Sequence, residues 1–258
     1  MTLTDNPIWE RTGILLDEAA MQRLHQTGIL LAGLGGVGSF VAEALARAGI
    51  GRLTIADHDR VSASNLNRQL CALHSTIGRS KAEVIAERIA DINPQCELRI
   101  LDDFLDADGM PALVGEGHDF VVDAIDSLSS KVALIAAALE SGVPVAASMG
   151  AGGKLDPTRI RVGDLMDSQQ CPLAREVRRR LRRRGLARGV LAVWSEEPSR
   201  PPLPPEAVGR GRPRAVNGTI SYMPALFGLT LAGSVIQRLV AQADPPSAVQ
   251  TARNLPGS

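Results

Sequence analysis

The sequence predicts an α/β fold in which a doubly wound, mainly parallel sheet is covered by flanking helices and followed by a C-terminal extension. From Gly28 onward, short apolar runs alternate with segments of helical periodicity, as in strand–helix–strand units. The chain of 258 residues is longer than an ordinary single domain but short for two domains. Apolar residues make up 45% of the chain and charged residues 22%, as in a folded globular protein. We therefore expect one domain over residues 1–258.

The expected elements follow from apolar runs and from residues that stop helices. Strands are predicted at 29–32, 53–56, 97–101, 120–124 and 144–147, with a further one at 159–162. Between the first two strands, apolar residues from Val37 to Ala48 recur at helical spacing, and Gly49 follows as a C-terminal cap. A second helix is predicted over 75–92, ended by Asn93 and Pro94.

Two segments are predicted to lack regular structure. Residues 195–218 are rich in proline and arginine and are expected to form a mobile loop, and residues 244–258 a disordered tail. Between them, an apolar helix is predicted over 220–241. Three helix breakers interrupt it, Pro224, Gly228 and Gly233, so we expect a core helix and no membrane association.

Four glycines, Gly33, Gly35, Gly36 and Gly38, lie between the first predicted strand and its helix. This spacing permits a tight turn whose backbone amides face an anion at the helix N-terminus. Asp57 ends the second strand, where a carboxylate can accept both hydrogen bonds of a ribose diol. The pattern is typical of a Rossmann-like nucleotide-binding unit, and alone it would indicate an NAD-dependent dehydrogenase.

The following segment favours ATP over NAD. The chain there has the dense polar run Ser64-Asn65-Leu66-Asn67-Arg68-Gln69. Lys81 lies on the apolar stripe of the second helix, where a phosphate would be a suitable partner, although its ammonium could also reach solvent. Asp126 follows the fourth strand at the edge where ligands of doubly wound folds collect, and its carboxylate suits a triphosphate bound with Mg²⁺. NAD has no terminal phosphates for Arg68 and Lys81.

Taken together, these motifs resemble the ThiF/MoeB adenylating superfamily, whose fold is shared with ubiquitin-activating enzymes. Further stretches are similar to its branch of tRNA threonylcarbamoyladenosine dehydratases, among them AEALARAGIG, AERIADINP, GAGGKLDPT, PLAREVRRRLRRRG and NGTISYMPALFG. The resemblance covers most of residues 9–241. It implies ATP-dependent dehydration of threonylcarbamoyladenosine in tRNA through an adenylated carboxylate.

By this resemblance, Arg68, Lys81 and Asp126 form the catalytic set, and Asp126 also binds Mg²⁺. The residues implied to bind ATP are Gly33, Gly35, Gly36, Gly38, Asp57, Ser64, Asn65, Asn67, Arg68, Lys81, Asp126 and Ser127. The superfamily's N-terminal arginine motif, which reaches a partner subunit's ATP, is replaced here by Arg11-Thr12-Gly13-Ile14. A homodimer is expected, but an arginine supplied between subunits is not assigned.

The three cysteines, Cys71, Cys96 and Cys171, form no Cys-x-x-Cys pair, so no zinc site or disulfide framework is predicted. An adenylating activator of a ubiquitin-like sulfur-carrier protein remains the alternative, although it would need a placed thiol. A non-enzymatic nucleotide-binding tRNA partner and an additional sulfur-transfer partner protein also stay open. The N-terminus has no apolar run of signal-peptide length, so a cytoplasmic location is expected.

A basic helix is predicted near 173–184. The whole chain has 28 basic and 28 acidic residues, but residues 161–214 contain 13 arginines and six acidic residues. The helix has an apolar stripe, and its other face carries more arginines than the helix dipole can stabilise, because the dipole acts only on the last turn. We expect this face to contact tRNA through Arg178, Arg179, Arg182 and Arg183.

Overall fold

The computed structural model describes residue 3, residues 6–206 and residues 214–241. Within these residues, a seven-stranded sheet has the order β3-β2-β1-β4-β5-β7-β6, in which β6 runs antiparallel to β7 and the other neighbours are parallel. The strands are β1 (Gly28–Ala32), β2 (Arg52–Ala56), β3 (Glu97–Leu101), β4 (Phe120–Asp123), β5 (Val145–Ser148), β6 (Ile160–Asp164) and β7 (Val190–Ser195). The predicted Rossmann-like, mainly parallel sheet is confirmed, and its order reverses between β1 and β4.

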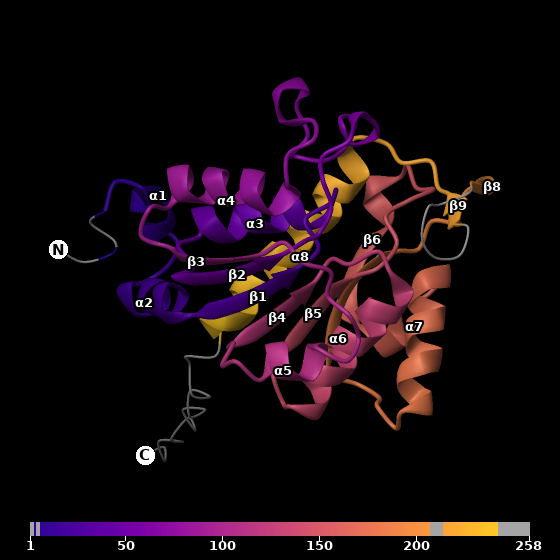
Figure 1. The fold of residues 1–258 in the computed structure, drawn as a ribbon. Coiled ribbons are helices and arrows are strands. Elements are labelled where there is room, and N and C mark those ends of the chain that lie inside the picture. The colour runs from indigo at the N-terminus through magenta and orange to yellow at the C-terminus, as the bar shows by residue number, and fades with distance from the viewer. Residues whose placement is uncertain (1–2, 4–5, 207–213, 242–258) are drawn as a thin grey trace, which may run out of the picture.

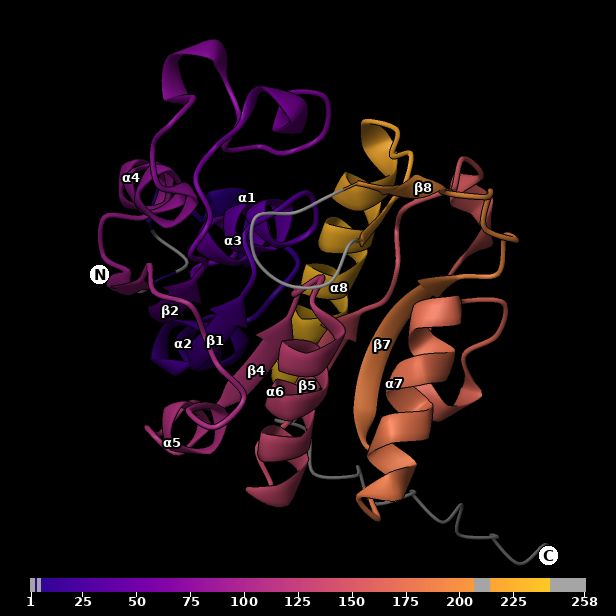
Figure 2. The ribbon, with the colours of Figure 1, turned by 45° about the vertical axis from the view of Figure 1, so that its right-hand side comes forward.

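Helices cover both faces of the sheet (Figures 1 and 2). One face carries α2 (Glu18–Gln26), α3 (Gly38–Arg47), α4 (Lys81–Ile92) and α8 (Tyr222–Ala241). The other carries α5 (Met110–Val114), α6 (Leu128–Glu140) and α7 (Pro172–Arg183). A short α1 (Glu10–Gly13) precedes them, and 3₁₀ turns occur at Ala63–Asn65, His74–Thr76, Pro157–Arg159 and Leu165–Asp167.

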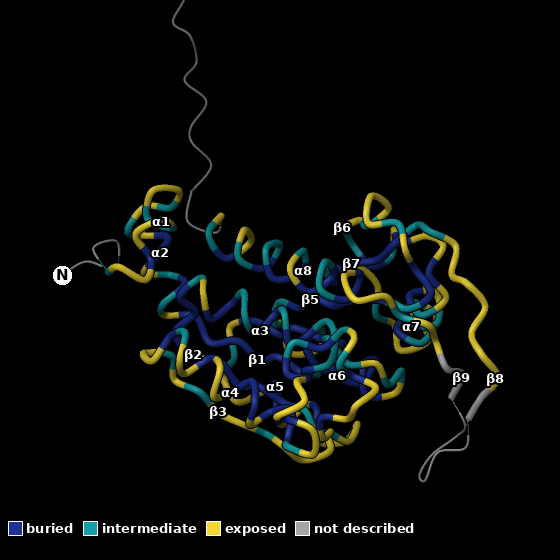
Figure 3. The backbone as a smooth tube through the Cα atoms, turned by 90° about the horizontal axis from the view of Figure 1, so that it is seen from above, coloured by how far each residue is buried: buried dark blue, intermediate teal, exposed yellow. Residues whose placement is uncertain are grey.

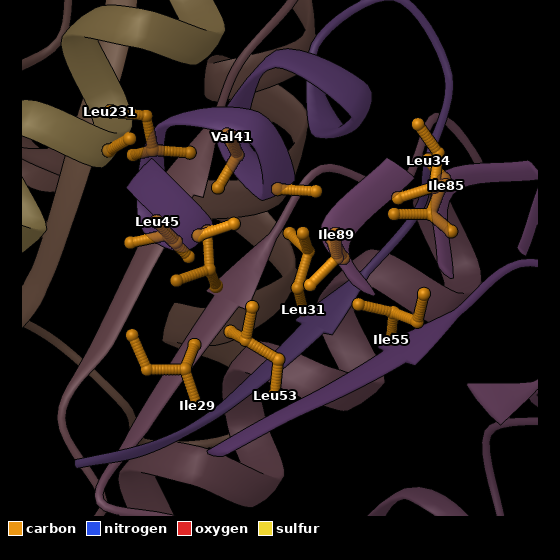
Figure 4. Close-up of a cluster of buried hydrophobic side chains, with 14 of the residues drawn as sticks. Ile29, Leu31, Leu34, Val41, Leu45, Leu53, Ile55, Ile85, Ile89 and Leu231 are labelled. Carbon is orange, nitrogen blue, oxygen red and sulfur yellow. The ribbon is translucent and has the colours of Figure 1, made fainter. Parts of the chain in front are cut away.

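The central strand β1 shows why two apolar layers form. Its side chains alternate between the faces, so Ile29 and Leu31 join the cluster with α3, α4 and α8, while Leu30 joins the cluster with α5, α6 and α7. Figure 4 shows Ile29 and Leu31 among side chains from β2, α3 and α4. Because both faces are covered, every residue of β1 is buried, as is usual for a parallel strand.

The last helix, α8, packs against α3 and the sheet. A Cβ at Gly228 would lie 2.4 Å from the Val37 carbonyl oxygen, so the glycine permits this close helix crossing. By length and composition α8 could cross a membrane, and 44% of its most apolar stretch is buried inside the protein. Its packing on α3, β5 and β7 agrees with the predicted core helix.

Several elements differ from the prediction. The helix predicted over 75–92 begins only at Lys81, because the side chain of Ser80 caps it by accepting a hydrogen bond from the Glu83 amide. The sequence patterns also missed α2, α5, α6 and β7. In the segment predicted as a mobile loop, the structure has the end of β7 and a two-stranded ladder of β8 (Leu203–Glu206) and β9 (Arg214–Val216). Residues 207–213 and the predicted tail lie outside the described residues.

Candidate nucleotide-binding site

A cleft of about 410 Å³ opens at the carboxyl edge of the sheet, where the strand order reverses between β1 and β4. In doubly wound folds this is where ligands bind. Loops after β1, β2, β3 and β4 line it, together with the start of α8. It brings together many of the predicted site residues: Gly33, Gly35, Gly36, Asp57, Asn65, Arg68, Lys81, Asp126 and Ser127.

The glycines after β1 have different roles. Gly33 has a φ of +90°, and a Cβ there would lie 2.7 Å from the Ala124 carbonyl group. A Cβ at Gly38 would lie 1.7 Å from the Gly33 carbonyl oxygen, and Gly38 is buried in α3 away from the cleft lining. Gly38 therefore allows the loop to close, whereas Gly35 and Gly36 line the space available to a ligand.

Asp57 is fixed by the loop that it faces. One carboxylate oxygen accepts a hydrogen bond from the Leu34 amide at 2.6 Å, and the other accepts one from the Asp59 amide at 2.9 Å. Each oxygen keeps a further lone pair that could accept a ribose hydroxyl. The position at the end of β2 agrees with the ribose role that the sequence predicted.

Lys81 has a protein partner that the sequence did not predict. Its side chain is buried at the start of α4, and Nζ donates a hydrogen bond to Asp59 Oδ2 at 2.7 Å. The Lys81 amide also donates to the Asp59 carbonyl oxygen at 3.0 Å. Lys81 nevertheless lines the cleft, so its contact with a phosphate stays a prediction.

The polar run after β2 is divided by the fold. Arg68 lines the cleft, and its Nη1 donates to the Ser64 carbonyl oxygen at 2.8 Å and to Asn67 Oδ1 at 2.9 Å, which orients the guanidinium. Asn65 is buried and its side chain accepts a hydrogen bond from the Ser62 amide. Asn67 donates to the Thr219 carbonyl oxygen. Ser64 and Asn67 lie outside the cleft lining and position their neighbours in this structure.

On the opposite side of the cleft, Asp126 and Ser127 precede α6. Beneath them, Asp123 and Lys131 form a fully buried ion pair at 2.5 Å, and Lys131 also donates to the Ser148 carbonyl oxygen at 2.9 Å. Burial raises the pKa of Asp123 and outweighs the opposite effect of Lys131. This pair ties the ends of β4 and β5 to α6 and thereby fixes the loop that carries Asp126.

Three cleft residues were missed or assigned elsewhere from the sequence. Asp59 follows Asp57 by two residues, and together with His58 they offer oxygen and nitrogen atoms within 4.8 Å of one another. His58 is exposed where it lines the cleft, and its ring meets that of Phe104 edge-on with 5.0 Å between the ring centroids. Phe104 is 61% exposed despite its apolar ring. The acidic spacing after β2 was a usable signal for Asp59.

The predicted basic helix is α7 in the structure. The predicted apolar stripe of α7 is confirmed, since Ala174, Val177 and Leu181 are fully buried. Arg178, however, turns back toward the protein and donates to the carbonyl oxygen and the hydroxyl of Ser168. One nitrogen of its guanidinium is thereby engaged by the protein, and the predicted contact of this helix with tRNA stays a prediction.

The cysteines do not form a reactive group among the described residues. Burial raises the pKa of the Cys71 thiol and raises that of Cys96 to about 11, which leaves little thiolate near neutral pH. Cys171 is buried at the start of α7. In the described part of the chain, the one cluster able to hold a metal contains no cysteine.

The fold and cleft define a nucleotide-binding protein of the adenylating type, and residues 10–255 match the model of the ThiF family. The chain therefore belongs to the ThiF family. It is 46% identical to the tRNA threonylcarbamoyladenosine dehydratase of Escherichia coli over 171 residues, 66% of this chain and 64% of that protein. It is 34% identical to the enzyme of the same name from Bacillus subtilis over 239 residues, 90% of this chain and 94% of that protein.

A solved structure extends the similarity over nearly the whole chain. The crystal structure of E. coli tRNA N6-threonylcarbamoyladenosine dehydratase in complex with ATP superposes with a TM-score of 0.81 and 38% identity. The match covers 91% of this chain and 94% of that chain. The relative shares both the three-layer architecture and enough sequence for its ATP complex to be relevant to the cleft described above.

Proposed function

We propose that this protein is an ATP-dependent tRNA threonylcarbamoyladenosine dehydratase. The observation that carries the proposal is one cleft with a carboxylate at the end of β2, Asp57, and two cations for phosphates, Arg68 and Lys81. NAD would use the first feature and leave the cations without terminal phosphates. The relatives that bear this activity in their names, and the ATP complex of one of them, support the same reaction.

In the proposed reaction, the threonyl carboxylate of the modified nucleoside attacks the α-phosphorus of ATP and pyrophosphate leaves. The carbamoyl group then attacks the adenylated carbonyl carbon, a ring closes and AMP leaves, so the net change in the nucleoside is loss of water. The protein positions the reactants: backbone amides near Gly36 face the α-phosphate, while Arg68 and Lys81 stabilise the departing pyrophosphate. Neither step requires an enzyme thiol.

The donor set of the cleft fits Mg²⁺. Four carboxylates line it, those of Asp57, Asp59, Asp103 and Asp126, against two permanent cations. A triphosphate would be repelled by this excess of negative charge unless a divalent cation came with it. Asp126 and Asp59 are the residues that would hold Mg²⁺, which would neutralise charge on the phosphates.

A homodimer is part of the proposal. Large apolar side chains are exposed directly after α1 and on α8: Ile14 is 71% exposed, Leu15 83% and Leu229 46%. Figure 3 shows α1, α2 and α8 along one side of the molecule. α2 packs on α8, and Arg23 Nη2 donates to the Val240 carbonyl oxygen. A second copy covering this face would remove these side chains from water. A sulfur-transfer partner protein stays an open prediction.

The test is nucleoside mass spectrometry of tRNA carrying threonylcarbamoyladenosine, before and after incubation with the protein and ATP. We expect a product lighter by one water and formation of AMP and pyrophosphate. Lys81→Ala and Asp126→Ala should each lower the rate by roughly 10²-fold or more, because they act on charge in the transition state.

Asp106→Ala is the matched control, since Asp106 is an exposed acidic residue after β3 that lies outside the cleft lining. It should keep the wild-type rate. Wild-type protein that consumes ATP only with an added ubiquitin-like carrier would overturn the proposal in favour of a sulfur-carrier activator. ATP binding without any turnover would favour the non-enzymatic tRNA partner.

A further inference from the structure

We propose that Gln69 is a further catalytic residue, whose side-chain amide donates a hydrogen bond to a non-bridging oxygen of the α-phosphate, and that the buried thiol of Cys71 positions this amide. The proposal rests on the function proposed above and adds a contact to it. Arg68 and Lys81 act on the departing pyrophosphate. A side-chain donor for the α-phosphate, which stays on the nucleoside, is the role that they leave unfilled.

Gln69 lies beside the glycine turn that follows β1. It is 9% exposed and lines the cleft. Its Nε2 lies 3.7 Å from the position that a Cβ of Gly35 would take. Gly35 and Gly36 line the cleft as well, and Gly36 is where backbone amides face the α-phosphate in the proposed reaction. The amide of Gln69 thus borders the space that these glycines leave open for a ligand.

The Nε2 of Gln69 has no hydrogen-bond acceptor in the described part of the chain. The other polar groups of this residue are all engaged there. Its backbone amide donates to the Asn65 carbonyl oxygen, its carbonyl oxygen accepts from the Ala72 amide, and its Oε1 accepts from the Cys71 thiol. A buried primary amide costs free energy unless its N–H groups find an acceptor. An acceptor on a ligand in the cleft explains why this amide lies where it does.

The thiol of Cys71 determines which way the amide of Gln69 points. Cys71 is 2% exposed, and its Sγ lies 3.7 Å from Gln69 Oε1 and 3.9 Å from the Leu34 carbonyl oxygen. Burial raises the pKa of this thiol, so it keeps its proton and can donate. Because a carboxamide is planar, an oxygen held toward Cys71 leaves the NH₂ group on the side of Gly35. The buried thiol thereby has a role although neither reaction step uses it.

The segment that carries this glutamine is held against the glycine turn by a buried serine. The Leu70 amide donates to Ser39 Oγ at 3.2 Å, and Ser39 Oγ donates to the Gly35 carbonyl oxygen at 2.7 Å. A Cβ at Gly36 would lie 3.4 Å from the Arg68 carbonyl oxygen, so the two segments are in direct contact. The amide therefore has a fixed position relative to the turn, as a donor needs in order to stabilise a transition state.

A neutral donor suits the α-phosphate in both steps of the proposed reaction. When the carboxylate attacks the α-phosphorus, charge is spread over the non-bridging oxygens, and a positioned N–H group stabilises it. When the ring closes, AMP leaves with its negative charge on the same phosphate. The amide can donate to that phosphate in ATP, in the adenylate and in AMP, whereas pyrophosphate has already left after the first step.

The first experiment compares Gln69→Ala and the isosteric Gln69→Glu with the control Gln95→Ala, an exposed glutamine before β3 and outside the cleft lining. Dehydration is measured with ATP and with the two diastereomers of ATP in which sulfur replaces one non-bridging α-oxygen. Gln69→Ala should lower kcat by about 10²-fold. Gln69→Glu should lower it at least as much, because its carboxylate repels the phosphate. Gln95→Ala should keep the wild-type rate.

The sulfur-substituted nucleotides report on the contact itself. Sulfur is a weaker acceptor than oxygen, so wild-type protein should prefer the diastereomer that keeps oxygen opposite Gln69. In Gln69→Ala this preference should shrink by roughly ten-fold, the value of one hydrogen bond to a charged group. A change that only disturbs the fold would lower the rate with both diastereomers equally.

The positioning by Cys71 is tested with Cys71→Ala and Cys71→Ser. Serine keeps a donor next to Gln69 Oε1 and alanine does not. Cys71→Ala should therefore lower kcat and the diastereomer preference, and Cys71→Ser should keep most of both. Thermal unfolding is followed for each variant. Equal losses in the two variants, or a loss of stability with an unchanged preference, would show that Cys71 only fills space in the core.

The outcomes separate this contact from the proposed function. If wild-type protein dehydrates the tRNA but its diastereomer preference is absent, or is the same in the Gln69 variants, the contact is overturned while the function stands. If wild-type protein leaves the tRNA unmodified but binds ATP with a diastereomer preference that depends on Gln69, the function fails and the contact with the α-phosphate stands. Wild-type protein that does not bind ATP would overturn both.

Discussion

The chain has three lysines, and the structure buries all of them: Lys81 is 4% exposed, Lys131 0% and Lys154 2%. Each buried ammonium has an oxygen partner, namely the Asp59 carboxylate, the Asp123 carboxylate or the Glu197 carbonyl. Burial lowers the pKa of Lys154, an effect opposed by Cys171 and Glu197. The exposed cations of the chain are therefore arginines, whose planar guanidinium suits surface contacts with carboxylates and phosphates.

At the residue scale, we predict that Lys131→Met lowers the free energy of unfolding by about 3 to 5 kcal/mol, because it leaves the carboxylate of Asp123 buried without its partner. Urea unfolding followed by circular dichroism measures the loss. The double variant Asp123→Asn with Lys131→Met should recover part of it, since an amide oxygen can still accept the hydrogen bond of the Ile125 amide. A single variant as stable as wild type would show that the pair does not hold this edge of the sheet together.

At the element scale, one glutamate links two helices. Glu43 on α3 accepts hydrogen bonds from Arg47 on the same helix at 2.7 Å and from Arg88 on α4 at 2.5 Å. Only 13% of its side chain is exposed. Burial raises the pKa of Glu43, but the bonds from Arg88 and Arg47 outweigh it and lower the pKa below the usual 4.5 of a glutamate.

The lowered pKa of Glu43 predicts how its contribution to stability changes with pH. Since folding favours the ionised form of Glu43, its contribution to stability is fully present above its unfolded pKa of 4.5 and is lost as the pH falls through the lower folded value. Glu43→Gln should cost about 1 kcal/mol at pH 7. The difference in free energy of unfolding between Glu43→Gln and wild type should become smaller below pH 4.5. Denaturant unfolding at several pH values measures it. A constant difference down to pH 3 would contradict the link between the two helices.

At the scale of the whole molecule, the cleft joins parts that are far apart in the chain. The loops after four parallel strands meet there with the start of α8, and Asn67 is hydrogen-bonded across to Thr219. A ligand held by all of these segments stabilises the folded state as a unit, because the unfolded chain has no such site.

We predict that ATP with Mg²⁺ raises the unfolding temperature by several degrees, whereas NAD does not. At a concentration a hundred times its dissociation constant, a ligand that binds only the folded state stabilises it by about 2.7 kcal/mol. A thermal-shift comparison of the two nucleotides at equal concentration measures this. A shift with NAD equal to that with ATP would restore the dehydrogenase alternative.

The sequence by itself determined the features that depend on short-range pattern. Short apolar runs located six of the seven strands of the main sheet. Four of them, β1, β2, β4 and β5, are parallel and largely buried, and such strands are locally apolar. The glycines after β1 and the position of Asp57 predicted a nucleotide cleft, because the turn and the strand end impose these residues locally. Helical spacing of apolar residues likewise predicted the buried stripe of α7.

Tertiary structure decided the pairings between segments distant along the chain. Lys81 meets Asp59 across 22 positions and Arg178 meets Ser168 across 10, and no local pattern specifies either contact. The exposed ring of Phe104 became a cleft residue only because β3 lies beside β2 in the sheet. Side-chain charge and spacing are properties of the sequence. Which of those charges remain available to a ligand depends on what the fold places within hydrogen-bonding distance of them.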